Sequence, residues 1–278
     1  DKWEEFWCHK MSNPENYISP EDKKIRVAFG TLDTGLVGEW KFDEGSGDTA
    51  HDSSGHGNDG TRYNFANGWV SGKYGNALEF DGSDDYVSVD DNDQQLALDA
   101  FTFEAWIKVL SGWSNYDRIV SKKGSLSWNA ASGWSLEINT GGMMTFLGSG
   151  GTYGDRLSMG WQQDTWHHVA ITKEAGATVV KGYLDGQYKD DQSCNTISPN
   201  TQPLTLAFYP NENSYTPIII DQVRIYNRSL SPEEIKASYE TGSAQIKNLN
   251  IKPQSQPVKA EIDFIQFYVN SASGNYYF

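Results

Sequence analysis

Cysteine and long apolar runs are nearly absent from this sequence. Two cysteines, Cys8 and Cys194, occur in 278 residues. They are compatible with one disulfide or with two buried thiols, so they do not define a redox compartment. No apolar run approaches the roughly 20 residues that a membrane-spanning helix needs, so we expect no membrane span.

Basic residues are also scarce, because 22 Lys and Arg stand against 37 Asp and Glu and give a formal net charge of −15. This charge repels phosphate backbones, so we do not expect nucleic acid as a partner. An acidic excess suits a protein that takes up cations, and it equally suits a surface charged for solubility alone. The chain starts at Asp1 without a visible leader, which we interpret as a mature or trimmed extracellular or cell-surface protein.

Glycine and aromatic residues are abundant by contrast. The chain holds 27 Gly, 10 Trp and 15 Tyr, and no long helical period is visible. Short apolar runs separated by turn residues predict an all-β fold, an antiparallel jelly-roll sandwich of two sheets. The predicted strands are Leu36–Phe42, Ala77–Phe80, Tyr86–Val89, Phe101–Val109, Arg118–Lys122, Trp134–Asn139, Met143–Gly148, Trp166–Lys173, Val179–Leu184, Leu204–Phe208 and Ile218–Tyr226.

Two segments carry clear local signals. In Phe101–Val109, Phe, Phe, Ala and Ile alternate with Thr, Glu, Trp and Lys, so the first set is expected to face the core. Farther along, Ser231 suits a helix N-cap, Pro232 the first helical position and Gly242 the stop. We therefore predict one short helix after the last strand.

The segment 1–34 lies before the sandwich and has its own pattern. Aromatic and acidic residues at its start predict a short amphipathic helix. The alternation in Lys24–Phe29 predicts a strand with one buried face.

The segment 243–278 follows the sandwich. Its Ala260–Asn270 stretch is apolar on both faces, and we expect Ile262, Phe264 and Phe267 to be buried. An unpaired strand of this kind would promote aggregation, so it must pair. The alternatives are Lys24–Phe29 of the same chain or the edge of a neighbouring copy.

Several longer stretches between residues 35 and 242 occur together in a characteristic order: GLVGEWKFDEGSGDTAHDSSGHGNDG, GKYGNALEFDGSDDYVSV, FTFEAWIK, RIVSK, GWSLEIN, TWHHVAITK, YLDG and IDQVRIYNRSLSPEEIKASYETG. In this order and spacing they resemble a laminin-G-like domain of the concanavalin A-like jelly-roll superfamily. The resemblance implies the fold but not the function, because the superfamily includes lectins, glycoside hydrolases, polysaccharide lyases, pentraxins and adhesion modules.

Catalytic carboxylates are not apparent. Glycosidases that share this fold carry an E-x-D-x-x-E strand, whose spacing keeps the acids on one face. Residues 35–242 lack this pattern, and Glu104 is alone on its strand. We therefore expect no enzyme activity, and a polysaccharide-degrading enzyme remains the weakest of the functional hypotheses.

The Asp43–Gly60 stretch is rich in oxygen-bearing side chains and glycines, a mixture that suits calcium. Asp43, Asp52 and Asn58 are the expected ligands within it. In jelly rolls of this kind the first and last strands pair antiparallel, which would bring Asp221 beside Asp43. The alternative is a loop closed by its own hydrogen bonds without metal. A second group, Asp81 to Asp85, is expected to form a hairpin turn.

Exposed aromatic residues bind sugar faces, and the predicted loops beside the RIVSK strand contain Trp113, Tyr116 and Trp128. These three are the candidate ligand-binding residues, although packing in the core explains them equally well.

The sequence thus leads to two main hypotheses. The first is an extracellular, calcium-stabilised laminin-G-like module that binds a glycan or a cell-surface protein. The second is a structural subunit of an extracellular filament, pilus or sheath that binds copies of itself through its flanks and displays the jelly roll outward.

Overall fold

The computed structural model describes residues 4–7, 24–27, 35–91, 93–123, 133–140, 143–147, 157–194, 197, 200–209 and 214–241. The chain divides into two compact units. One unit comprises residues 1–31 together with 243–278, and the other comprises residues 32–242. Each unit is described by itself.

The described part of the first unit is a pair of antiparallel strands. In it β1 (Glu4–Trp7) pairs with β2 (Lys24–Val27), so that Glu4 lies opposite Val27 and Trp7 opposite Lys24. The short helix expected near the start of the chain is therefore wrong. Pairing with β2 gives the backbone of this aromatic-rich segment its hydrogen bonds, and aromatic residues favour strands.

Some of the sequence predictions concern flanking residues that the structure does not describe. Ile262, Phe264 and Phe267 lie outside the described residues, and so does Cys8. Cys194 is a free thiol that is buried in the second unit.

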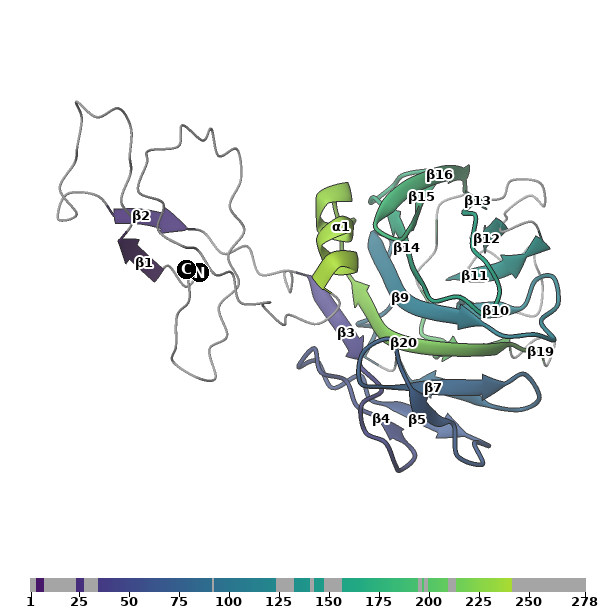
Figure 1. Cartoon of the computed structure of the whole chain (residues 1–278). Coiled ribbons are helices and arrows are strands. Elements are labelled where there is room, and N and C mark those ends of the chain that lie inside the picture. Colours follow the sequence, from purple (N-terminus) through teal and green to yellow (C-terminus); the bar gives the residue numbers. More distant parts are fainter. Residues whose placement is uncertain are drawn as a thin grey trace, which may run out of the picture. The chain divides into compact units, whose positions relative to one another are not determined.

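The second unit is a sandwich of two eight-stranded sheets in which neighbouring strands are antiparallel (Figure 1). In the first, called sheet I, β3 (Leu36–Trp40) lies beside β20 at the side of the main strand order. That order is β16 (Gln187–Ser193), β15 (Val179–Leu184), β14 (His167–Lys173), β9 (Phe101–Val109), β20 (Pro217–Tyr226), β7 (Asn76–Asp81) and β6 (Trp69–Ser71).

The second sheet, called sheet II, lies against the inner face of sheet I. Its order is β13 (Leu157–Ser158), β12 (Met143–Leu147), β11 (Gly133–Asn139), β10 (Arg118–Lys123), β17 (Leu204–Leu206), β8 (Tyr86–Val89), β5 (Gly60–Tyr63) and β4 (Thr49–Ala50). A separate small pair joins β18 (Phe208–Tyr209) to β19 (Ser214–Tyr215). The all-β, antiparallel jelly-roll prediction is confirmed.

Alternation along the strands builds the core between the sheets. Phe101, Phe103 and Ile107 of β9 are buried in one large apolar cluster, as the sequence predicted. Leu136 of β11 and Leu206 of β17 belong to the same cluster from sheet II. Burying each side chain of this size stabilises the fold by about 1.5–3 kcal/mol.

The outer face of sheet I is also buried where a helix covers it. The helix is α1 (Pro232–Thr241), and its Ile235 packs with Ala170, Tyr183 and Tyr226 in a second apolar cluster. The predicted N-cap is confirmed: Glu234 N donates to Ser231 Oγ at 3.2 Å, and Ser231 N donates to a Glu234 carboxylate oxygen at 2.8 Å. This reciprocal pair forms a capping box.

Glu104 lies on this covered face and is fully buried. It accepts a hydrogen bond from Ser238 of α1 and pairs with Arg224 Nη1 at 3.4 Å. Arg224 Nε in turn lies 2.8 Å from Glu39 Oε1 on β3. Glu104 and Arg224 together therefore connect β9, β20, β3 and α1.

Several element boundaries differ from the sequence prediction. The first sandwich strand stops at Trp40, because Phe42 has a φ of +56°. Ala207, with a φ of +58°, divides the predicted strand Leu204–Phe208 into β17 and β18. The polar strand β16 was missed, because exposed positions at the end of the sheet carry no apolar alternation.

Candidate functional site

Asp52 organises the loop that the sequence singled out. Its Oδ1 accepts hydrogen bonds from Glu39 N at 2.9 Å and Ser54 N at 2.8 Å. Its Oδ2 accepts from Ser54 Oγ at 2.8 Å and Asn58 N at 2.9 Å. Partial burial raises the pKa of Asp52, but these hydrogen bonds outweigh it and hold the pKa below its ordinary value.

Asn58 fixes the same loop to the sandwich. Its Nδ2 donates to Val37 O at 2.7 Å, and its backbone carbonyl accepts from Trp40 Nε1 at 2.9 Å. Both partners belong to β3. The loop hydrogen bonds expected in the alternative without metal are thus present at Asp52 and Asn58, and metal binding by these two residues stays a prediction.

Asp43 and Asp221 meet at a different place, the turn that joins β6 to β7. Asn76 N donates to Asp43 Oδ1 at 2.9 Å, and Tyr74 N donates to Asp221 Oδ2 at 2.9 Å. The expected antiparallel pairing of β3 with β20 is present, with Trp40 opposite Val223. The structure therefore brings Asp43 and Asp221 to one turn but leaves Asp52 and Asn58 on another set of contacts.

The turn fits closely around both carboxylates because of two glycines. A Cβ on Gly72 would lie 2.6 Å from Asp221 Oδ2, and one on Gly75 would lie 2.0 Å from Asp43 Oδ1. Gly72 N also donates to Gly75 O at 3.0 Å, which closes the turn. Any larger residue at Gly75 would push the turn away from Asp43.

Asp221 is electrostatically unusual. The residue is fully buried, and its Oδ1 has no hydrogen-bond partner among the described residues. Burial raises the pKa of Asp221 to about 7, and the negative charge of Asp43 adds to this shift. The backbone amides of Tyr74, Lys73 and Gln222 oppose it by hydrogen bonding to the carboxylate. Positive charge beside Oδ1 would stabilise the ionised carboxylate.

Aromatic side chains close one side of this site. Trp106 of β9 lies directly opposite Asp221 in the register with β20. The ring of Tyr74 meets the Trp106 ring edge-on at 5.8 Å, and Lys73 Nζ lies 4.5 Å from the centre of the same ring. Trp106 and Asp221 are both buried, at 4% and 0% exposed.

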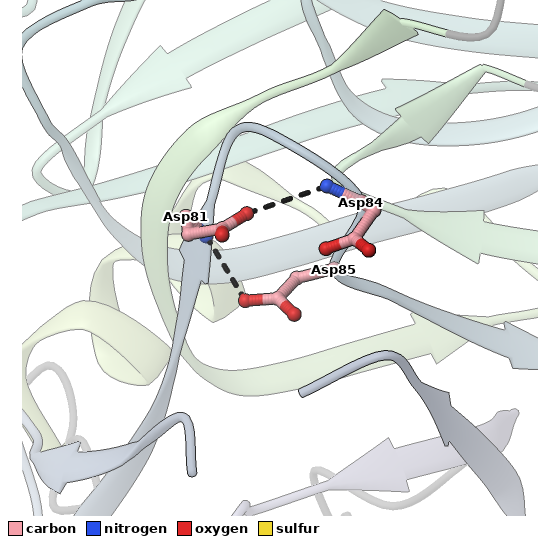
Figure 2. A group of neighbouring side chains, drawn as sticks. All are labelled: Asp81, Asp84 and Asp85. Atoms are coloured by element: carbon pink, nitrogen blue, oxygen red, sulfur yellow. Dashed lines mark hydrogen bonds between the residues drawn. The ribbon is translucent and has the colours of Figure 1, made fainter. Parts of the chain in front are cut away.

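A second acidic group lies in the turn between β7 and β8. Among the described residues, Asp81, Asp84 and Asp85 form the one group of three or more potential metal ligands in which one ligand atom from each residue lies within 4.8 Å of the others. Figure 2 shows Asp81 facing both partners: Asp81 N donates to Asp85 Oδ2 at 3.2 Å, and Asp84 N donates to Asp81 Oδ1 at 3.4 Å. These bonds close a tight turn that crosses from β7 in sheet I to β8 in sheet II. The predicted hairpin is therefore wrong, because β7 and β8 pair with other strands and not with each other.

Two of the three predicted ligand-binding aromatic residues lie in the described part of the chain. Trp113 is half-buried, with Nε1 donating to Gln163 Oε1 at 3.2 Å and its ring edge-on to Trp161 at 5.3 Å. Tyr116 is half-buried at a φ of +74°. Trp128 lies outside the described residues. Trp113 is therefore attached to the core rather than free at a rim.

Sequence reasoning missed a more exposed aromatic group on sheet II. Tyr63 of β5 stacks on Tyr86 of β8 with ring centres 4.6 Å apart and planes 9° from parallel. Phe208 and Tyr215 continue the group. The alternation in the short run YVSV is the signal that would have placed Tyr86 on an outer face. The run GTRY carries no such signal, because its buried side chain is that of Arg62.

A membrane-crossing helix is not found in the described part of the chain, where α1 is too short for the task. No curated protein sequence matches this chain. A laminin-G family profile, described as the concanavalin A-like lectin/glucanases superfamily, matches residues 81–236.

Solved structures share the fold at low identity. The binding domain of Paraclostridial Mosquitocidal Protein 1 matches with a TM-score of 0.56 and 19% identity over 76% of this chain and 53% of that one. Trypanosoma rangeli sialidase matches with a TM-score of 0.57 and 19% identity over 75% of this chain and 33% of that one. A mutant of HCR/D matches with a TM-score of 0.58 and 19% identity over 76% of this chain and 52% of that one. This chain thus spans about half of the toxin domain and a third of the sialidase, and the likeness shows the fold alone.

Proposed function

Because the chain belongs to the laminin-G-like group of the concanavalin A-like lectin/glucanases superfamily, we propose that it is an extracellular carbohydrate-binding module of a cell-surface protein. Calcium at Asp43 and Asp221 stabilises the module in this proposal. The name of the family includes lectins, and one solved structure with the same fold is a toxin's binding domain. A binding role for this chain rests on that kinship and on the site described above.

The observation that carries the calcium proposal is the buried, unpartnered Oδ1 of Asp221. Calcium takes six to eight oxygens in forgiving geometry, from carboxylates, backbone carbonyls and water. The Asp221 oxygen and the exposed Asp43 carboxylate supply two negative charges at one turn. A bound cation would neutralise the repulsion between them and replace the solvation that Asp221 loses on burial.

The described carboxylates favour binding over hydrolysis. Glu104 is covered by α1 and engaged by Arg224 and Ser238. On sheet II, Glu137 Oε1 is ion-paired with Arg118 at 3.0 Å, and both side chains are buried. A retaining or inverting glycosidase needs two carboxyl groups that flank the scissile bond, and these two acids are committed to cations of the fold.

Thermal unfolding with calcium and with EDTA tests the calcium part. A ligand that binds only the folded state raises its melting temperature, so calcium should raise the Tm of the wild-type chain and EDTA should reverse the rise. Asp221→Asn should abolish the response, since the amide keeps an acceptor for Tyr74 but supplies no negative charge. The matched control is Asp84→Asn in the second acidic group, which should respond to calcium like the wild type.

An equal calcium-induced rise in Tm in the wild type and in Asp221→Asn would rule out this site. Loss of the rise only in Asp84→Asn would indicate that calcium binds at the β7–β8 turn. The carbohydrate part is tested separately by binding to an array of immobilised glycans. Absence of binding to every glycan would refute it. The filament hypothesis depends on flank residues outside the described ranges.

A further inference from the structure

Two stacked tyrosines stand on the outer face of sheet II. Tyr63 and Tyr86 lie directly opposite each other in the register of β5 with β8. Their neighbours Arg62 and Val87 are buried, so the tyrosines point away from the core. Tyr63 is 41% exposed and is one of three large exposed apolar side chains among the described residues.

One face of the Tyr63 ring is open because the neighbouring strand is short. β4 has two residues, and they pair only with Thr61 and Gly60 of β5. Continuing this antiparallel register places Gly47 opposite Tyr63. Gly47 carries no side chain, and a Cβ built on it would meet nothing within 4 Å. Tyr86 therefore covers one face of the ring, and the position opposite Tyr63 on the other side carries no side chain.

The tyrosine pair is held by further aromatic rings. Tyr86 packs on Phe208 at 4.5 Å, and Phe208 stacks on Tyr215 at 4.7 Å with planes 17° apart. Each ring restricts the rotamers of the next. A pre-ordered aromatic surface loses little side-chain entropy when a ligand binds, which is why tyrosine is favoured in binding sites.

The border of this surface is acidic. Asp81 and Asp84 are exposed in the turn that leads into Tyr86. Asn64, which follows Tyr63, donates through Nδ2 to Asp84 O at 2.9 Å and so joins the turn to β5. Asp48 is exposed on the side of β4. Carboxylates on both sides accept hydrogen bonds from hydroxyl groups, and they repel anions.

We propose that the open face of Tyr63, backed by Tyr86, is the stacking platform for an uncharged hexopyranose of a glycan. The proposal rests on the carbohydrate-binding role proposed above and locates it away from the calcium site. The ring face of a pyranose presents C–H groups that pack on an aromatic ring, while its hydroxyl groups reach the acidic border. Sugars that carry a carboxylate, such as sialic acid, are disfavoured by the same border.

Titration of the wild-type chain with lactose and with sialyllactose, followed by saturation-transfer NMR, tests the proposal. The two probes differ by one anionic sugar. Lactose should bind, and sialyllactose should bind several-fold more weakly. Tyr63→Ser should weaken lactose binding by about tenfold, the loss expected for one aromatic contact of about 1.4 kcal/mol. Tyr63→Phe keeps the ring and should bind lactose almost normally.

The matched control is Tyr188→Ser, because Tyr188 is an equally exposed tyrosine, 50% exposed, on β16 of the other sheet. It should leave lactose binding unchanged. Asp84→Lys offers a gain-of-binding variant that does not alter the tyrosines, and it should improve sialyllactose binding relative to lactose. Thermal melts of each variant confirm that a loss of binding is not a loss of folding.

The outcomes separate this inference from the general proposal. Lactose binding that survives Tyr63→Ser but disappears in Trp113→Ala would overturn the platform and leave a carbohydrate-binding module. Tighter binding of sialyllactose than of lactose by the wild type would overturn the selectivity for uncharged sugars. If the wild type binds other glycans of the array but not lactose, the assignment of lactose-type sugars to the Tyr63 platform is wrong. If it binds no glycan at all, both this proposal and the carbohydrate-binding function are wrong.

Discussion

Asp52 and Asp221 are both acidic residues expected at one metal site, yet their surroundings differ. Every carboxylate oxygen of Asp52 accepts hydrogen bonds from its own loop or from β3, whereas Asp221 keeps one buried oxygen without a described partner. The pKa of Asp52 is lowered despite partial burial, while burial raises the pKa of Asp221 to about 7. Only Asp221 therefore has an unmet need for positive charge.

An acidic composition does not by itself identify a cation site. The Asp52 loop is rich in acidic residues and glycine, but its polar groups satisfy one another locally. Asp221 comes from a mostly apolar strand, PIIIDQVRIY, and becomes unusual only because the Gly72–Asn76 turn covers it. A structural role for Asp52 and a ligand role for Asp221 make different predictions.

The largest expected effect is at Asp52. Asp52→Ala removes the acceptor of four hydrogen bonds and leaves part-buried donors unpaired, which should lower the free energy of unfolding by about 2–4 kcal/mol. Urea denaturation with excess EDTA measures the change. Asp48→Ala is the control, because the Asp48 side chain is exposed, and it should cost less than about 0.5 kcal/mol. Equal losses in the two variants would contradict the structural role of Asp52.

A smaller difference between a variant and its matched control is expected at the turn that holds Asp43. Gly75→Ala adds a Cβ 2.0 Å from Asp43 Oδ1 at a φ of +58°. Gly176→Ala is the matched control, with a φ of +67° and no atom within 4 Å of the added Cβ. Both should lose about 1 kcal/mol from the positive φ, and Gly75→Ala should lose about 1–3 kcal/mol more from crowding.

Calcium sharpens this second test. Displacement of the turn in Gly75→Ala should also reduce the calcium-induced rise in Tm, and Gly176→Ala should keep the full rise. Differential scanning fluorimetry with calcium and EDTA reports both quantities. If the two alanine variants lose the same stability and keep the same calcium-induced rise in Tm, the close fit of the turn around Asp43 does not contribute to stability.

The smallest effect is a pH dependence from Asp52. Because its pKa is lower in the folded state than in the unfolded chain, its contribution to stability is complete above the unfolded pKa of about 4 and is lost as pH falls through the folded pKa. Asp52→Asn should therefore be less stable than wild type at neutral pH, by about 1 kcal/mol. The difference should shrink in acid. Urea unfolding at a series of pH values measures it, and a constant gap would exclude Asp52 as the source.

Much of the fold could be predicted from local pattern. The alternation in Phe101–Val109 identified its core face, and Ser231 with Pro232 marked the start of the helix. The strand β16 could not be predicted in this way, since an exposed strand at the end of a sheet needs no apolar period. Burial of Glu104 could not be predicted either, because α1, distant in sequence, covers it.

The candidate site was predictable only in part. Pairing of the first and last strands was expected from the resemblance, and it brought Asp43 and Asp221 to one turn. The stacking of Tyr63 on Tyr86 was not expected, because it depends on the register of β5 with β8. The uncovered side of Tyr63 depends in turn on the shortness of β4.

The sequence by itself determined the strand class, the position of the helix and the family, because period-two alternation, capping residues and ordered motifs are local properties of the chain. The tertiary structure decided which polar groups have partners. Asp52 and Asp221 are the same residue type in the sequence. The distinction between them arises from the backbone amides and glycines that the fold places around each carboxylate. Burial then sets the electrostatic consequence, since a carboxylate without water must find its charge compensation in its neighbours.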